Sequence, residues 1–287
     1  LGLWYGGLLV DNGELDGGES GISGVEVALV DSSDGTVVMT DTTSASGLYN
    51  FTGVVSGTYV VSITAPSGYY SSGTDAGDPD TDTDDGDDNG LGNGIGEIVS
   101  DPISLTAGNT SNGSIVTNVD GTTTNNLVDF GLYQKATVGD TVWYDTDGDG
   151  IQDVGEQGIS GVTVRLRNAG DDSLAGVDTT DGSGNYSFTN LDPGDYYVEF
   201  VAPADYQPSP QDAGSDALDS DADISTGQTT STTLVSGEND TTWDAGFYQI
   251  TLGNQVWEDT DNDGTFDGGE SGISGVTVAL VDAVDGT

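Results

Sequence analysis

The sequence contains the same module more than once, and this internal repeat limits the folds open to the chain. Residues 138–168 (VGDTVWYDTDGDGIQDVGEQGISGVTVRLRN) align without a gap with residues 252–282 (LGNQVWEDTDNDGTFDGGESGISGVTVALVD). Residues 1–31 form a third copy, whose first half departs from the pattern. Because self-similarity of this kind indicates one structural unit used several times, the fold has to be that of a module in tandem.

The first two copies remain similar beyond this stretch. Residues 46–69 (SGLYNFTGVVSGTYVVSITAPSGY) match residues 183–206 (SGNYSFTNLDPGDYYVEFVAPADY). Both copies then run through an acidic tract and close on DFGLYQ (129–134) or DAGFYQ (244–249). The shared ending marks where one module stops and the next begins.

We therefore predict three domains. The first covers 1–134 and carries an acidic insertion at about 78–120, the second covers 135–249, and 250–287 is a partial third repeat. The partial repeat holds roughly two strands, which are too few to bury a core. We expect a longer chain or a neighbouring subunit to complete it.

The local sequence pattern is that of β-strands. Runs such as VEVALV (25–30), VTVRL (162–166) and YYVEFV (196–201) are rich in β-branched and aromatic residues and lie between turn-forming residues. No segment keeps a helical apolar period beyond one turn. The prediction is all-β, with tandem Greek-key β-sandwiches. Aromatic residues that recur in register are assigned to the core or to half-buried sheet faces: Tyr49, Phe51, Tyr59, Tyr186, Phe188 and Tyr196.

The charge of the chain excludes several kinds of partner. Its 287 residues include 50 acidic and 3 basic ones, for a net charge of -47. Such a chain repels nucleic acid and anionic membranes, and no apolar run is long enough for membrane insertion. The absence of His and Cys removes the commonest general base and most zinc chemistry. We predict that the protein is not an enzyme.

A twelve-residue acidic loop, DTDGDGIQDVGE (145–156), has the spacing of a calcium site. Calcium prefers six to eight oxygen ligands, and such loops place acids at positions 1, 3, 5, 9 and 12, a backbone carbonyl at 7 and Gly at 6. The predicted ligands are Asp145, Asp147, Asp149, Ile151 through its carbonyl, Asp153 and Glu156.

The same loop recurs in the partial third repeat. The predicted ligands there are Asp259, Asp261, Asp263, Thr265, Asp267 and Glu270. In the first copy Leu8 and Val10 replace the first two acids, so we expect a weak site or none. Strand-like sequence flanks the loops, whereas a calcium sensor works by opening a pair of helices. The loop is therefore expected to hold structure together.

A second acidic group follows the DAG motif of each complete copy. Alternating acids beside Gly and Asn can bind calcium from a loop, but a solvated acidic loop without metal is the alternative. The candidate ligands are Asp212, Asp216, Asp219, Asp221 and Asp223 in the second domain and Asp75, Asp78, Asp80 and Asp82 in the first.

These motifs resemble a known family. GDTVWYDTDGDGIQDVGEQGISGVTV and GENDTTWDAGFYQ are similar to the SdrD B-like domains of microbial surface proteins, relatives of the collagen-adhesin B-type (Cna B) modules. The resemblance covers nearly all of 135–249, most of 1–134 and the opening of the third copy. It implies an immunoglobulin-like or prealbumin-like sandwich that calcium stiffens and that serves as a stalk or spacer.

The function that this combination indicates is structural. We expect an extracellular, cell-surface, calcium-stabilised repeat protein that forms a stalk, sheath or filament from copies of itself. The alternative is an adhesin that binds an external ligand through the insertion at about 78–120. Adaptation to high salt would also explain the charge, but not the spacing of the loops, and both interpretations can hold together.

Three further features carry less weight. Trp143 and Trp257 occupy equivalent positions in two repeats, just before the acidic loop. This placement favours a role in packing over sugar binding. The resemblance to Cna B modules implies that an intramolecular isopeptide bond would need one lysine per domain. Lys135 is the only lysine, so such a bond cannot stabilise every domain. Sequons that would carry glycans if the source glycosylates occur at Asn50, Asn109, Asn112, Asn185 and Asn239.

Overall fold

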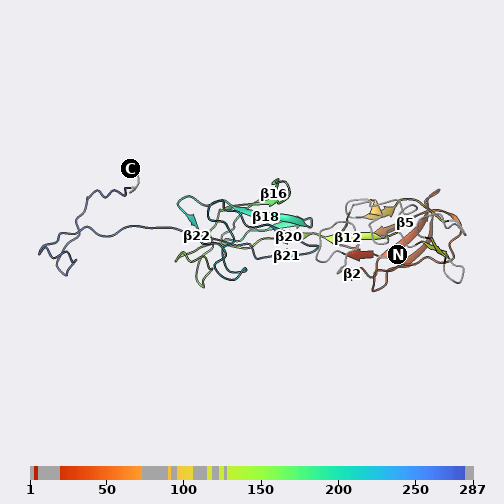
Figure 1. Cartoon of the computed structure of the whole chain (residues 1–287), viewed down its shortest axis with the longest axis horizontal. Helices are drawn as coiled ribbons and strands as arrows, with labels where there is room; N and C mark the ends of the chain where they lie inside the picture. Colours follow the sequence, from red (N-terminus) through yellow and green to blue (C-terminus); the bar gives the residue numbers. More distant parts are fainter. Residues whose placement is uncertain are drawn as a thin grey trace. The chain divides into compact units, whose positions relative to one another are not determined.

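A computed structural model gives the architecture of the chain (Figure 1). The residues that it describes are 3–5, 20–72, 90–91, 96–105, 115–117, 123–125 and 128–281. Within these ranges the regular structure is all strand and contains no helix, which confirms the all-β prediction. Accordingly, the described residues include no helix long and apolar enough to cross a membrane.

The first repeat has two main sheets. One has the strand order β4-β3-β5-β8-β7, with β9 also paired to β5, and the other has the order β2-β1-β12-β6. A separate hairpin joins β10 and β11. The bounds are β1 Leu3–Tyr5, β2 Ser20–Gly21, β3 Glu26–Asp31, β4 Val37–Thr42, β5 Gly57–Thr64, β6 Tyr69–Ser71, β7 Gly90–Leu91, β8 Glu97–Ser100, β9 Ile103–Leu105, β10 Ile115–Thr117, β11 Thr123–Asn125 and β12 Phe130–Gln134.

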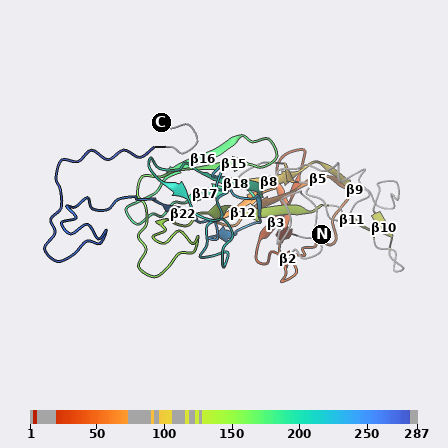
Figure 2. The same cartoon turned by 60° about the vertical axis from the view of Figure 1, so that its left-hand side comes forward.

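The second repeat has three small sheets. Their strand orders are β16-β15-β18-β20, β14-β22-β19 and β17-β13-β21. Figure 2 shows β15, β16 and β18 from a second direction. The bounds are β13 Ala136–Val138, β14 Val142–Tyr144, β15 Thr163–Asn168, β16 Leu174–Thr179, β17 Phe188–Leu191, β18 Gly194–Phe200, β19 Gln207–Pro208, β20 Thr232–Leu234, β21 Asn239–Asp240 and β22 Ala245–Tyr248.

Each of these repeats buries its own apolar core. The period-two pattern of the strands decides which side chains are inside, because successive residues point to opposite faces. Val27 and Leu29 of β3 are buried in the first core, and Val164 and Leu166 of β15 are buried in the second. The predicted placement of the recurring aromatic residues is confirmed, since all six are buried or partly buried in these cores.

Two tyrosines that occupy one repeat position make the same contact in both repeats. The Tyr49 hydroxyl donates to the Val128 carbonyl at 2.7 Å, and the Tyr186 hydroxyl donates to the Trp243 carbonyl at 2.6 Å. A buried tyrosine hydroxyl needs such a partner. This hydrogen bond connects the middle of each repeat to the residues just before its closing strand.

The chain divides into two compact units, Leu1–Tyr248 and Gln249–Thr287. The second unit has turns but no strand among its described residues. Val278 and Leu280 of this unit are 77% and 82% exposed, whereas their counterparts Val164 and Leu166 are fully buried. The partial repeat lacks the sheet partners that would cover these side chains.

Candidate metal centre

Strand β14 positions the first acid of the loop in the second repeat. β14 pairs in parallel with the closing strand β22, and the next residue, Asp145, donates its amide to the Phe247 carbonyl at 3.0 Å. Trp143 lies on β14 and is fully buried, which confirms a packing role. Asp145 is also fully buried, so the loop starts from the core of the sandwich.

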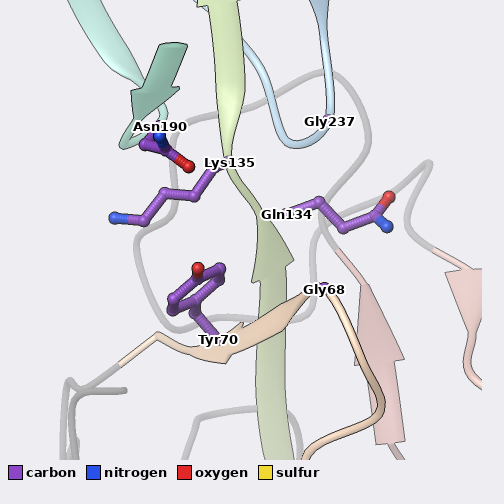
Figure 3. A pocket seen from close by; sticks show the side chains of 6 residues that line it. All are labelled: Gly68, Tyr70, Gln134, Lys135, Asn190 and Gly237. Atoms are coloured by element: carbon purple, nitrogen blue, oxygen red, sulfur yellow. The ribbon is translucent and has the colours of Figure 1, made fainter. Parts of the chain in front are cut away.

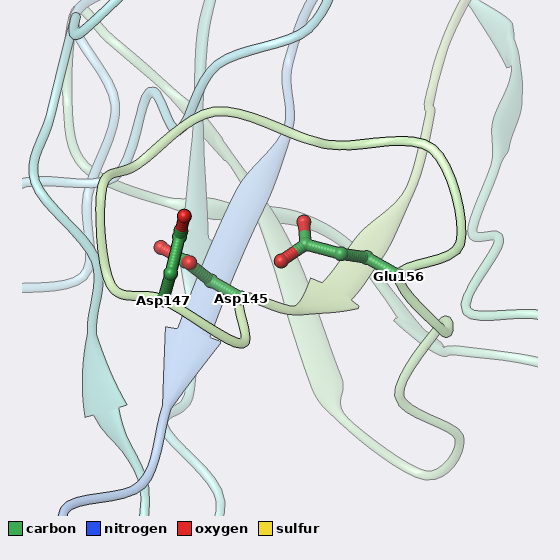
Figure 4. A group of neighbouring side chains, drawn as sticks. All are labelled: Asp145, Asp147 and Glu156. Atoms are coloured by element: carbon green, nitrogen blue, oxygen red, sulfur yellow. The ribbon is translucent and has the colours of Figure 1, made fainter.

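Three of the predicted ligands gather in this loop. Asp145, Asp147 and Glu156 each offer a carboxylate oxygen within 4.8 Å of the other two, and Figure 4 shows their side chains facing the space inside the loop. Like charges this close repel one another unless a cation lies between them. Hard carboxylate oxygens at this spacing fit a calcium ion.

Backbone amides hold the carboxylates in place. Asp145 accepts hydrogen bonds from Gly148 at 2.7 Å and Gly150 at 2.9 Å. Glu156, at the far end of the loop, accepts from Thr146 at 2.7 Å and Asp153 at 3.0 Å. The two ends of the loop are therefore closed on each other by main-chain donors.

The glycine at position 6 of the loop is required by both conformation and space. Gly150 has a φ of +85°, in a region that residues other than glycine rarely adopt. A Cβ atom there would also lie 2.3 Å from the Pro210 carbonyl oxygen. The loop is thus pressed against the chain at Pro210, near the start of the second acidic tract.

The carboxylates of the loop differ in the direction in which their pKa is shifted. Burial of Asp145 would raise its pKa, but hydrogen bonds, including those from Gly150 and Gly148, outweigh that effect and lower the pKa. Desolvation and the negative charge of Asp149 raise the pKa of Asp147. Asp145 is therefore kept ionised, as a metal ligand has to be.

The loop of the third repeat repeats three of these internal hydrogen bonds. Glu270 accepts from Thr260 at 2.8 Å and from Asp267 at 3.1 Å, and Asp259 accepts from Gly264 at 2.9 Å. Asp259, Asp261 and Asp263 offer oxygens within 4.8 Å of one another. The acids that meet therefore differ, at positions 1, 3 and 12 in the second repeat and at 1, 3 and 5 in the third, whereas the bonds that hold the last acid are the same in both loops.

The other predicted ligands of the two loops lie outside these close groups. Asp149 accepts from the amide of Ile151 at 2.9 Å, which closes a turn. The remaining residues of this set are Ile151, Asp153, Thr265, Asp267 and Glu270, and their ligand roles stay predictions.

The loop of the second repeat packs on the second acidic tract. Ser220 donates its amide to the Gly150 carbonyl at 3.0 Å, and Gln152 donates to the Leu218 carbonyl at 2.7 Å. Asp219, which forms a β-bridge with Ile151, is 3% exposed. The two acidic segments are therefore neighbours in the fold, through contacts between residues 66 to 70 positions apart in the sequence.

The members of this tract have different surroundings. Asp219 and Asp221 are buried, whereas Asp212 and Asp216 are exposed. Asp223 accepts from the amides of Ser225 and Thr226 and so closes its own turn. The candidates of the first domain (Asp75, Asp78, Asp80 and Asp82) and the acidic loop of the first copy lie outside the described residues.

One further aspartate, not predicted from the sequence, joins the buried acids. Asp244 is 1% exposed, donates its amide to Asp221 at 2.6 Å and accepts the amide of Thr141 at 3.1 Å. Burial, with the charges of Asp140 and Asp221, raises the pKa of Asp244 to about 8. Burial and neighbouring acids such as Asp219 raise the pKa of Asp221 to about 7.

A sequence signal for Asp244 existed. It occupies the same position in DAGFYQ as Asp129 does in DFGLYQ, and Asp129 is also buried. A buried acid retained in both copies indicates a role inside the fold, because isolated carboxylates are rarely buried without a partner.

The fold and the site together define a class of protein: an all-β module used in tandem, with an acidic loop folded against a buried group of aspartates. The chain belongs to the SdrD B-like domain family, whose model matches residues 9–132, 136–247 and 250–287. The resemblance seen in the sequence is thereby confirmed.

Relatives with this module are much longer proteins. The chain is 40% identical over 279 residues to serine-aspartate repeat-containing protein D of Staphylococcus aureus (strain Newman), with 96% of this chain and 19% of the relative covered. It is 40% identical over 275 residues to serine-aspartate repeat-containing protein F of Staphylococcus epidermidis, with coverages of 94% and 14%. The chain thus spans less than a fifth of the length of these relatives.

The matches among solved structures include pilins. The minor pilin GBS52 of Streptococcus agalactiae is 12% identical, with a TM-score of 0.29 and coverages of 88% of this chain and 97% of the pilin. The shaft pilin SpaA of Lactobacillus rhamnosus GG is also 12% identical, with a TM-score of 0.25 and coverages of 88% and 98%.

Proposed function

We propose that the chain is a calcium-stabilised structural segment of an extracellular, cell-surface protein, where its repeats form part of a stalk, sheath or filament. The observation that carries this proposal is that both acidic loops bring three carboxylates together. In each, three carboxylates meet within 4.8 Å and the last acid is held by the amides of positions 2 and 9. A surface turn without metal has no need for such a group of like charges.

Calcium would supply the positive charge that this group lacks. Asp145, Asp147 and Glu156 would hold the ion, and Asp145 would connect it to β14 and the core. Because the loop is bonded to the tract around Leu218 and Ser220, fixing the loop also fixes that tract. An ion that binds only the folded state stabilises that state by linkage.

The adhesin alternative stays a prediction. Most of the insertion at about 78–120 lies outside the described residues, and the structure describes β7 to β10 within it. Filament formation from copies of the chain and glycans on the sequons also stay predictions. Asn50, Asn185 and Asn239 are exposed and so accessible to modification, and Asn109 and Asn112 lie outside the described residues.

The test is a calorimetric calcium titration of the whole chain, after treatment with a chelator. We expect saturable binding that weakens in Glu156→Gln and Asp147→Asn. Asp205→Asn is the matched control, because Asp205 is exposed and belongs to neither acidic group. Binding that is absent, or that is unchanged in both loop variants, would contradict the proposal.

A further inference from the structure

The joint between the first two repeats is very short. β12 of the first repeat ends at Gln134 and β13 of the second begins at Ala136, so Lys135 alone separates the two strands. Leu132 and Ala136 are 1% and 0% exposed and belong to different cores. A flexible linker between two domains is normally exposed and longer, and this joint has neither property.

The main chain at the joint is bonded to the second repeat on one side. Gln134 donates its amide to the Ser236 hydroxyl at 2.8 Å and accepts the amide of Gly237 at 3.0 Å. Gly237 belongs to the turn between β20 and β21 and has a φ of +74°. These two bonds hold the end of the first repeat's closing strand against a turn of the second repeat.

The side chain of Lys135 bridges to the other side of the joint. Its ammonium lies 4.9 Å from the centre of the Tyr70 ring and 5.3 Å from that of Tyr133, both from the first repeat. It also forms an ion pair with Asp192, in the turn between β17 and β18 of the second repeat. Figure 3 shows Lys135 between Tyr70 of the first repeat and Asn190, which lies on β17 of the second.

The tyrosines form a connected group with this ion pair. Tyr70 and Tyr133 are cross-strand partners on β6 and β12, with ring centres 5.7 Å apart, and the Tyr133 hydroxyl donates to Asp192. The Asp192 carboxylate of the second repeat is thus bound by the side chains of both Tyr133 and Lys135. Cation–π contacts and exposed ion pairs are individually weak, so the joint depends on their acting together.

The distribution of charge makes Lys135 unusual. The chain has three basic residues, and residues 1–134 contain none. Arg165 and Arg167 both pair with Glu199 on the neighbouring strand of the same sheet. Lys135 is therefore the basic residue that stands between two acidic repeats that would otherwise repel each other.

The joint between the second and third repeats lacks the lysine and one of the two tyrosines. LYQKATVGD (132–140) corresponds to FYQITLGN (247–254), which is one residue shorter and has no lysine. Tyr70 aligns with Gln207 of the second repeat. The division of the chain into compact units falls at this next joint, after Tyr248, and not after Gln134.

We propose that Lys135, Asp192, Tyr70 and Tyr133 form a clamp that fixes the angle between the first and second repeats. The joint after Tyr248, which lacks the lysine and the first tyrosine, is not clamped in this way. The first two repeats would then act as one rigid segment, with bending concentrated at the next joint. None of the contacts in the clamp involves an acidic loop, so the test of the clamp is independent of the test of calcium binding.

The test measures the distance between the two repeats in the whole chain. The chain has no cysteine, so Thr52→Cys and Ser231→Cys, two exposed positions in different repeats, would take spin labels selectively. Pulsed electron paramagnetic resonance then gives the distribution of label-to-label distances. We expect a narrow distribution in the parent chain and one roughly twice as wide in Lys135→Met, because domain motion is the default once an interface is weakened.

Three variants give the controls. Arg165→Met removes the same charge inside one sheet and should keep the narrow distribution, while Lys135→Arg retains the cation and should keep it as well. Asp192→Asn should broaden it less than Lys135→Met, since the contacts to the rings remain. Circular dichroism establishes that each variant is folded. A broad distribution in the parent chain, an unchanged one in Lys135→Met, or equal broadening in Arg165→Met would overturn the clamp.

Discussion

The amide of Asp244 donates a 2.6 Å hydrogen bond to the carboxylate of Asp221, and both aspartates are buried. The bond joins the start of β22 to the second acidic tract. One sequence-distant contact therefore places two acids of raised pKa in the interior of the second repeat. The pH behaviour of the metal-free protein follows from it.

Metal-free stability should fall as the pH rises through neutrality. An unfolded aspartate titrates near pH ~4, whereas burial raises the pKa of Asp221 to about 7 and that of Asp244 to about 8. Between these values the folded state holds protons that the unfolded state has lost, so the free energy of unfolding decreases with pH. Thermal unfolding in chelator from about pH 5 to about pH 8.5 should show a falling melting temperature. A constant or rising value would contradict the assignment.

Asp244→Asn should flatten this dependence. The amide side chain keeps an oxygen for the Thr141 amide but carries no charge, so its burial costs less at high pH. At pH 8 in chelator we expect a melting temperature higher by on the order of 3 °C. Asp205→Asn should leave the curve unchanged, and a variant that kept the parent slope would show that Asp244 is not the titrating group.

Gly150→Ala should destabilise the second repeat more than Gly161→Ala. Both glycines have positive φ, +85° and +83°, but a Cβ at Gly161 would meet open space, whereas at Gly150 it would lie 2.3 Å from the Pro210 oxygen. The backbone term common to both costs about 1–2 kcal/mol, and the clash adds to it at Gly150 alone. Urea unfolding of both variants measures the difference, and equal losses would rule out the clash.

Glu199→Gln should lower stability although it reduces the negative charge of the chain. Glu199 is paired with Arg165 at 2.7 Å and with Arg167 at 2.6 Å, and its side chain is 17% exposed. Arg165 and Arg167 would each lose the ion pair with Glu199, and among the described residues only Arg167 would keep another, with Asp172. We expect this loss to cost about 1 kcal/mol at this degree of exposure. If general repulsion dominated instead, urea unfolding would find the variant more stable than the parent chain.

Sequence reasoning reached the features that short stretches determine. The repeat, the strand pattern and the loops at 145–156 and 259–270 follow from local spacing, and part of the hydrogen bonding of the loop recurs with that spacing. The role of Asp244 could not be predicted, because its burial depends on β14 pairing with β22 and on the tract packed beside it. Asp223 resembles its neighbours in sequence but closes its own turn. Long-range pairing thus decides the burial of Asp244, and a local turn sets Asp223 apart.

The most direct test of the account is thermal unfolding of the whole chain in excess calcium and in chelator, at equal ionic strength. At a calcium concentration of about 100 times the dissociation constant, linkage predicts stabilisation by ~2.7 kcal/mol. The account predicts a clear rise in melting temperature that is lost when Glu156→Gln and Glu270→Gln are combined and is retained in Asp205→Asn. An equal rise with sodium chloride alone, or full retention in the double variant, would contradict calcium as the element that stabilises these repeats.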